Sequence, residues 1–519
     1  MIPNADLPYA SVPFRSPGQV LEKGFSILVA IANYGTGNRQ HLERLISAYR
    51  AMRARVDIVV LSNIPKDLGT GVEVRVGLPS PNPWSLPFAH RKLFIERQRD
   101  YDLYIYSEDD TLILQHNIEA FLEAVEQLSD GEIPGFLRSE VAADGSVYIS
   151  SIHSHFRWRT SSVQRKRGGV YAEFSNEHSA CFILTQHQLA RAIRSGGFVV
   201  EPHQGRHDML CTAATDPYTQ CGMKKLIRLD RIDDFILPHL PNKYVGRMGI
   251  HREDLETQKK AMMEILENPA LIGRNFDVEA QSAAAGGNRN CYERPSGEVV
   301  ESVGRKGWRI LSVGCGWGES ERALSAKGAR VTGIPIDHVF GRMSESRGIE
   351  IVQGPALHAL ELLRPQRFDA ILFNGSLHLA SNPSELLSSA TTLLREGGVV
   401  VVKAPNLRDW RRRIAQWRAR ADISGPSSGP SGLRMLPDHK VLHDWLAAIP
   451  SAQVRVLPLF SPRRRRLARL APKIFGPLLA SEWLAVATVR QNPALVKETQ
   501  EHSPASGERA GNSLHTYGD

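Results

Sequence analysis

A glycine-rich turn in the second half of the chain constrains the fold more than any other feature. The apolar run Ile310–Val313 leads directly into Gly314, Gly316 and Gly318, and a helix-compatible segment follows. A strand that stops, a tight turn without side chains and a helix N-terminus together suit a nucleotide-like ligand. The sequence therefore predicts a strand–turn–helix unit with a ligand at the helix N-terminus.

Length and composition indicate a multidomain globular protein. The 519 residues exceed one ordinary core and suggest about two to three domains. Hydrophobic content of 42% and charged content of 23% are typical of soluble domains. No apolar run reaches the roughly 18 residues that span a bilayer, and the N-terminus lacks the pattern of a secretory signal. The five scattered cysteines indicate reduced thiols, so we expect a cytoplasmic protein.

The positive charge is concentrated late in the chain. The formal net charge is +9, and Arg411–Arg413 and Arg463–Arg466 contribute much of the excess. These runs form either a solvated basic surface or a surface that attracts an anionic partner such as acidic lipid or anionic glycan. Apolar residues after Arg466 give an amphipathic pattern, so peripheral contact with an anionic membrane is the alternative to a plain surface helix. No basic stripe is interleaved with aromatic residues, and we expect no nucleic-acid partner.

Strands and helices alternate in the first half. Residues 25–32, 56–61, 72–76 and 101–106 are strand-like, and helical spacing separates them. This alternation predicts an α/β domain with a parallel, doubly wound sheet. The predicted organisation is an irregular arm (1–24), a first domain (25–267), a linker (268–291), a second domain (292–490) and a disordered tail (491–519).

An acidic triplet ends the fourth of these strands. Glu108, Asp109 and Asp110 follow an apolar run, and acidic side chains there project into the crevice where α/β sheets bind ligands. Carboxylates in such a place hold Mg²⁺ or Mn²⁺, which neutralises a diphosphate. Residues 25–245 resemble A-type glycosyltransferases, with the triplet at their Asp-x-Asp metal motif. The resemblance implies a nucleotide-sugar donor, Asp110 as metal ligand, and Glu108 and Asp109 in contact with the donor or metal-bound water. Glu108 departs from the family's more usual Asp.

Two later residues complete the predicted first site. Asp208 precedes a helix-compatible segment, where inverting members of the family carry a general base; the alternative is a helix cap. Some members supply a late histidine to the metal, which makes His239 either a metal ligand or a structural histidine. Asp233 and Asp234 are alternative acids, and residues 175–182 are a candidate acceptor wall.

The second half resembles class I S-adenosylmethionine-dependent methyltransferases over about residues 292–490. The resemblance rests on the glycine turn, a second strand at 331–334, a fourth strand at 368–374, and the Glu-Gly-Gly turn at 396–398 before a fifth strand. The resemblance implies a seven-stranded Rossmann-like domain whose Gly314, Gly316 and Gly318 bind S-adenosylmethionine. The expected strands are 309–313, 330–334, 349–353, 368–373, 398–403, 453–459 and 482–489.

This domain departs from the family pattern where the donor ribose is normally held. Pro335 stands where an Asp or Glu is expected, and Asp337 is a candidate substitute. Ser312 replaces an acid before the glycines, and Gln353 begins a turn that usually offers an Asp to the adenine. A missing ribose partner weakens binding by about 1–3 kcal/mol. His378, after the fourth strand, is either a base for an acceptor hydroxyl or a packing residue.

Together these patterns predict a bifunctional cytoplasmic enzyme. A metal-dependent glycosyltransferase would be joined to an O-methyltransferase, both acting on a glycan or lipid-linked glycan acceptor, and tethering would raise the local concentration of the intermediate. Two alternatives remain open. The second domain is a non-catalytic binding module, or the chain is a membrane-associated assembly scaffold that uses its basic segment.

Overall fold

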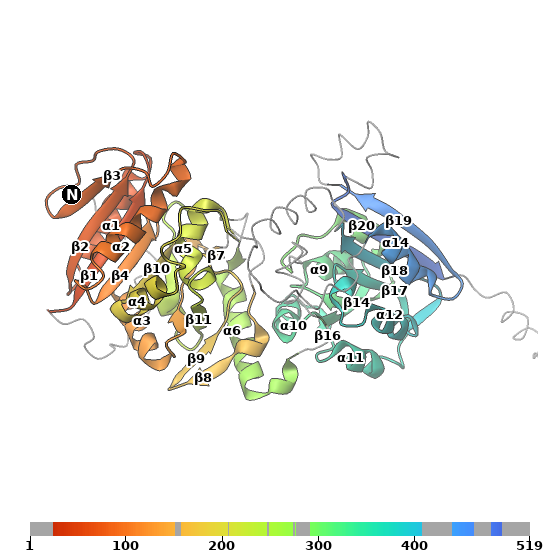
Figure 1. Ribbon diagram of the computed structural model, residues 1–519. Helices are drawn as coiled ribbons and strands as arrows, with labels where there is room; N and C mark the ends of the chain where they lie inside the picture. Colours follow the sequence, from red (N-terminus) through yellow and green to blue (C-terminus); the bar gives the residue numbers. More distant parts are fainter. Residues whose placement is uncertain are drawn as a thin grey trace, which may run out of the picture. The chain divides into compact units, whose positions relative to one another are not determined.

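The computed structural model describes residues 24–150, 157–205, 207–245, 249–272, 276, 291–406, 438–460 and 479–489. The chain divides into two compact units, residues 1–272 with 337–346, and residues 273–336 with 347–519 (Figure 1). The predicted N-terminal arm up to residue 23, most of the predicted linker, the predicted tail and both arginine runs lie outside the described residues.

The first unit is built on a five-stranded sheet. Its order is β10-β4-β1-β2-β3, with β10 antiparallel to β4 and the other pairs parallel. Every residue of β1 is buried, as expected for the central strand of a parallel sheet. The strands are β1 (Ser26–Asn33), β2 (Arg55–Ser62), β3 (Val72–Val76), β4 (Leu103–Glu108) and β10 (Cys181–Thr185).

Amphipathic helices accompany this sheet (Figure 1). The predicted apolar stripe of α1 is confirmed, since Leu42, Leu45, Ile46 and Tyr49 are its buried residues. The helical elements of the unit are α1 (Arg39–Arg50), η2 (Pro83–Phe88), α2 (Ala89–Glu96), α3 (Gln115–Gln127), η3 (Thr160–Ser162), α4 (Gln186–Arg194), α5 (Met209–Thr219), η4 (Ile232–Phe235), α6 (Arg252–Glu267), η5 (Pro269–Leu271) and α10 (His338–Glu345).

Two four-stranded sheets in the first unit lie beyond what the sequence predicted. Their orders are β5-β11-β9-β8 and β12-β6-β7-β13. The segment 203–245 contributes α5 and two of these strands, β11 and β12. The strands are β5 (Glu132–Pro134), β6 (Leu137–Val141), β7 (Val147–Ser150), β8 (Gln164–Lys166), β9 (Gly169–Ala172), β11 (Lys224–Arg228), β12 (Ile236–Pro238) and β13 (Ile250–His251).

The second unit contains one seven-stranded sheet, as predicted. Its order is β16-β15-β14-β17-β18-β20-β19; the first five strands are parallel, and β20 is antiparallel to both β18 and β19. This mixed sheet is Rossmann-like. The strands are β14 (Arg309–Cys315), β15 (Arg330–Pro335), β16 (Glu350–Ile351), β17 (Phe368–Asn374), β18 (Leu394–Pro405), β19 (Ala452–Leu459) and β20 (Glu482–Val489).

Short helices connect the strands of this sheet. They are α8 (Gly297–Val303), α9 (Glu319–Ala326), α11 (Ala356–Leu362), η6 (Leu377–Leu379), α12 (Pro383–Thr391) and α14 (His439–Ala447). Within the described ranges, no helix is both long and apolar enough to cross a membrane.

Candidate active sites

The acidic triplet lies at the C-terminal end of β4, beside the end of β1. Asp109 accepts a hydrogen bond of 2.7 Å from the Asn38 side chain and another from Asn33, the last residue of β1. Burial raises the pKa of Asp109, and these two amide hydrogen bonds act in the opposite direction. Both carboxylate oxygens of Asp109 therefore have protein partners, and the side chain fixes the turn that presents Asp110.

Asp110 and His239 lie together, although they are far apart in sequence. His239 Nε2 is 3.5 Å from Asp110 Oδ2, and His239 Nδ1 is 2.5 Å from Glu140 Oε1 on β6. The backbone sets this arrangement, since Leu240 N–H donates to the Asp110 carbonyl at 2.9 Å and His239 N–H donates to the Ser139 carbonyl at 2.8 Å. A carboxylate–histidine–carboxylate relay results, with Glu140 fixing the ring orientation.

Burial and mutual charge tune the acids of this site. Burial and then the neighbouring Asp110 raise the pKa of Glu108 to about 8, against the positive charge of Arg138. For Asp110, burial acts upward, but the hydrogen bond and charge of His239 hold its pKa below the usual value. The same contact, together with Glu140, raises the pKa of His239 although burial opposes the shift. The site therefore combines an ionised Asp110 with a Glu108 that is more readily protonated.

Asp110 and His239 fit as two ligands of a divalent cation. Asp110 Oδ1 is buried and has no hydrogen-bond partner among the described residues. Glu140 engages Nδ1 of His239, so Nε2, which faces Asp110, is the nitrogen that a metal would bind in place of a proton. The described residues contain no group of three or more His, Cys, Asp or Glu side chains arranged around a metal. Mg²⁺ and similar ions commonly use one or two protein ligands and complete their shell with water and substrate phosphate.

Asp208 is the N-cap of α5, which is the capping role considered from the sequence. Its Oδ1 accepts a hydrogen bond of 2.9 Å from Cys211 N–H. Burial raises the pKa of the Cys211 thiol, and the negative charges of Glu108 and Asp208 add to that effect. The Cys211 thiol therefore lies in the electrostatic field of both Glu108 and Asp208.

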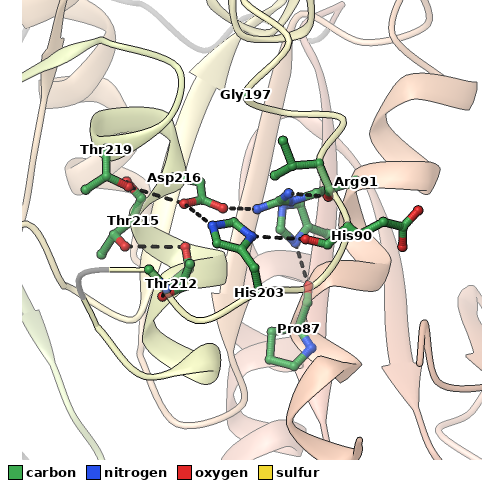
Figure 2. Close-up of polar contacts among 12 residues, drawn as sticks. Pro87, His90, Arg91, Gly197, His203, Thr212, Thr215, Asp216 and Thr219 are labelled. Carbon is green, nitrogen blue, oxygen red and sulfur yellow. Dashed lines mark hydrogen bonds and ion pairs between the residues drawn. The ribbon is translucent and has the colours of Figure 1, made fainter. Parts of the chain in front are cut away.

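A buried ion pair that the sequence did not reveal joins α2 to α5. The Asp216 carboxylate lies between the Arg91 guanidinium, with which it pairs, and the His203 ring, whose Nε2 is 3.7 Å away (Figure 2). Arg91 also donates to the Val200 carbonyl at 2.8 Å. The side chains of Arg91 and Asp216 are only 6% and 1% exposed, so the pair fixes the helix whose N-cap is Asp208.

Breaking this pair is expected to destabilise the first unit strongly. Arg91→Met leaves Asp216 as a buried carboxylate without its main cationic partner, and we expect a loss of about 3–5 kcal/mol. The matched control is Lys92→Met, which removes a 4.0 Å pair with Glu96 that is 85% and 41% exposed, and should change stability by less than about 1 kcal/mol. Denaturant unfolding measures both. Equal stability of the two variants would contradict the structural role of Arg91.

In the second unit, the glycine turn is packed tightly by protein atoms. Gly314 has φ +74°, and an added Cβ would lie 2.5 Å from Ser376 Cβ; at Gly316 it would lie 2.5 Å from the Cys291 carbonyl oxygen. Gly318, with φ +92°, is the N-cap of α9. The turn therefore admits no side chain at its first two glycines, and α9 begins immediately after the third.

Hydrogen bonds lock the ends of β14 and β17 beside this turn. Ser376 Oγ donates to the Val313 carbonyl at 2.5 Å, and the Asn374 amide donates to Ser320 Oγ on α9 at 3.1 Å. Ser312, at the position where the family often has an acid, donates to Glu321 of α9 at 2.7 Å. A carboxylate is thus present beside Ser312, supplied from the helix.

The other predicted residues of this half have defined places. Pro335 ends β15, and Asp337 caps α10 by accepting from Phe340 N–H at 2.9 Å, while burial raises its pKa. His378 lies in η6 directly after β17 and is 4% exposed. Capping engages one carboxylate oxygen of Asp337, and the ribose role of that residue stays a prediction.

The fold and the glycine turn define the class of this unit: a Rossmann-like domain in which β14 leads through a glycine turn into α9. A family model described as "Methyltransferase domain" matches residues 277–431. The second unit therefore contains a class I S-adenosylmethionine-dependent methyltransferase domain.

Individual relatives agree with this assignment. The chain is 31% identical over 113 residues to a ubiquinone biosynthesis O-methyltransferase of Xylella fastidiosa (strain M23), which covers 21% of this chain and 46% of the relative. A protein of the same description from Stutzerimonas stutzeri (strain A1501) is 28% identical over 21% of this chain and 49% of its own length. The chain thus spans about half the length of these curated relatives.

A solved structure of a SAM-dependent methyltransferase from Archaeoglobus fulgidus is also similar. It is 16% identical, with 37% of this chain and 90% of that chain covered and a TM-score of 0.30.

Proposed function

We propose that this chain is a two-site transferase that builds and methylates a glycan. The second unit would transfer a methyl group from S-adenosylmethionine, and the first would transfer a sugar from a nucleotide-sugar donor with the help of Mn²⁺ or Mg²⁺. The observation that carries the first activity is the Asp110–His239–Glu140 relay beyond the end of β4. The described relatives of the second unit are O-methyltransferases, which favours a hydroxyl acceptor.

The first site has the groups that leaving-group departure requires. Asp110 and His239 would hold the divalent cation, which when bound neutralises the diphosphate of a departing nucleotide. Glu140 orients His239, and Asp109 keeps the triplet turn in place through Asn33 and Asn38. Asp208 is a candidate to accept the proton of the acceptor hydroxyl, since its second oxygen is not used by the cap.

A conservative variant separates the two roles of Asp208. Asn caps helices about as well as Asp, so Asp208→Asn should keep stability within about 0.5 kcal/mol of the parent. An amide cannot act as a general base, and we expect kcat for sugar transfer to fall about 100- to 10,000-fold. Unfolding and turnover are measured on the same preparation. Unchanged kcat together with unchanged stability would leave Asp208 as a cap only.

The second site works by alignment. Methyl transfer is an in-line displacement, which depends on holding the sulfonium donor and the acceptor atom in register. The glycine turn would bring the donor to the N-terminus of α9, and His378, buried just after β17, is a candidate base for an acceptor hydroxyl. We expect His378→Ala to retain residual activity because alignment survives its loss.

A nucleotide-sugar hydrolysis screen with and without Mn²⁺ tests the glycosyl-transfer proposal. Release of a nucleoside diphosphate that depends on Mn²⁺ would support it and name the donor class. If the chain binds neither Mn²⁺ nor any nucleotide, the glycosyl-transfer proposal is wrong, and the methyltransferase domain remains as the basis of function.

Pro335 and the missing Asp at the turn that begins with Gln353 favour a second candidate for the methyltransferase half, a binding module without catalysis. Saturable binding of S-adenosylmethionine followed by transfer to an added glycan would exclude it. Peripheral membrane contact through Arg463–Arg466 is a separate proposal, tested by co-sedimentation of the parent and a charge-neutralised variant with anionic vesicles. Equal partitioning of the two proteins would exclude that contact.

A further inference from the structure

Arg138 is a buried cation of the first unit. It lies on β6, between Leu237 of β12 and Ser150 of β7, and is 2% exposed. All three of its side-chain nitrogens are buried, and none has a hydrogen-bond partner among the described residues. A buried charge in this condition carries a desolvation penalty of several kcal/mol.

Other buried arginines of the first unit are paired. Arg228 on β11 is 5% exposed and contacts Glu123 at 2.8 Å and Asp230 at 3.2 Å. Arg91 pairs with Asp216. Arginine in this unit is thus normally buried together with a carboxylate, and the unpaired state of Arg138 is specific to its position.

The strand geometry directs Arg138 toward the proposed metal pair. Side chains alternate along a strand, so Arg138 and Glu140 lie on the same face of β6. Glu140 contacts His239 on that face. The charge of Arg138 also acts on the pKa values of Glu108, Asp110 and His239, although burial is the largest influence on each. The guanidinium therefore acts on these three groups through space, and within the described part of the chain no ion pair joins it to any of them.

We propose that Arg138 binds an oxyanion of the ligand, either a phosphate or a sugar carboxylate. This rests on the proposed function of the first site and adds a second anionic contact to the metal. A guanidinium presents its N–H groups as a planar fork that matches two oxygens of such a group. A structural counter-charge for the local acids would instead be hydrogen-bonded to one of them.

Unfolding of the ligand-free Arg138→Met variant distinguishes an anion-binding arginine from a structural counter-charge. Because no partner loses a hydrogen bond, the variant should unfold at a midpoint equal to or above that of the parent chain. The matched control Arg228→Met leaves Glu123 and Asp230 without this partner and should unfold at a lower midpoint. A lower midpoint for Arg138→Met, comparable to that of the control, would overturn the proposal.

Calorimetric titration then identifies the ligand group. The probes are inorganic pyrophosphate and glucuronate, each with and without Mg²⁺, and Mn²⁺ alone reports the metal pair. We expect Arg138→Met to bind one of the two anions about 10- to 100-fold more weakly than the parent, with Mn²⁺ affinity unchanged. Weaker pyrophosphate binding names a phosphate, and weaker glucuronate binding names a sugar carboxylate.

Two results separate this inference from the proposed function. Equal affinity of parent and variant for both anions, or no binding of either anion to the parent, overturns the role of Arg138 even if Mn²⁺ binds. If Mn²⁺ does not bind the parent, the metal-dependent function fails, while a loss of anion affinity in Arg138→Met without metal still supports the anion site.

Discussion

Asp110→Asn is expected to abolish divalent-cation binding by the first unit. The substitution keeps the shape of the side chain but removes the charge that faces His239 Nε2 at 3.5 Å. Loss of a residue that only orients a metal ligand typically costs 10- to 100-fold in affinity, so loss of the ligand itself should cost at least about 100-fold. Mn²⁺ titration by electron paramagnetic resonance measures the affinity, and Mn²⁺-dependent turnover should disappear with it.

Two further variants calibrate this result. Glu140→Gln leaves Asp110 and His239 in place but weakens the hold on His239, and should lower Mn²⁺ affinity about 10- to 100-fold. Asp67 is an exposed carboxylate that accepts a hydrogen bond from Gly69 N–H at 3.1 Å, and Asp67→Asn should leave Mn²⁺ affinity unchanged. Full Mn²⁺ affinity in Asp110→Asn would show that the relay is structural.

Gly314→Ala is expected to cause the largest loss in the second unit. Alanine at this position would have to adopt the left-handed backbone conformation of Gly314, with φ +74°. Its Cβ would lie 2.5 Å from Ser376 Cβ. Left-handed backbone costs about 1–2 kcal/mol, and overpacking adds about 1–3 kcal/mol. We therefore expect a total destabilisation of roughly 2–5 kcal/mol and loss of S-adenosylhomocysteine binding, measured by chemical unfolding and calorimetry.

Gly307→Ala is the matched control. Gly307 has φ +81°, but an added Cβ there meets nothing within 4 Å. This variant should lose only the backbone contribution of about 1–2 kcal/mol and should bind S-adenosylhomocysteine normally. Equal ligand affinity in both variants would show that the packing of the turn against Ser376 does not shape the donor site.

The large sheets could be predicted because their central strands are largely apolar. β1 is buried along its whole length, and β4 and β17 are nearly so, which leaves an unambiguous sequence signal. The small sheets could not be predicted in this way. β6 pairs with β12, about a hundred residues further along the chain, and its five residues include an arginine, a serine and a glutamate. Whether such a short, partly polar segment forms a strand depends on pairing with a segment distant in sequence.

The candidate sites show the same division. Asp110 and His239 were accessible through a family resemblance, and the structure brings them together. Glu140 and Arg138 were missed, although charged residues alternating within an apolar segment are a visible signal of a strand facing a polar site. The Arg91–Asp216 pair left no local signal, since 125 residues separate its members.

Calorimetric titration of one sample of the full chain, first with S-adenosylhomocysteine and then with Mn²⁺, is the most direct test of a two-site transferase. We expect saturable binding of one equivalent of each probe. Gly314→Ala should lose only the binding of S-adenosylhomocysteine, and Asp110→Asn only the binding of Mn²⁺. Absence of saturable binding of either probe by the parent chain would contradict the assignment of the corresponding site.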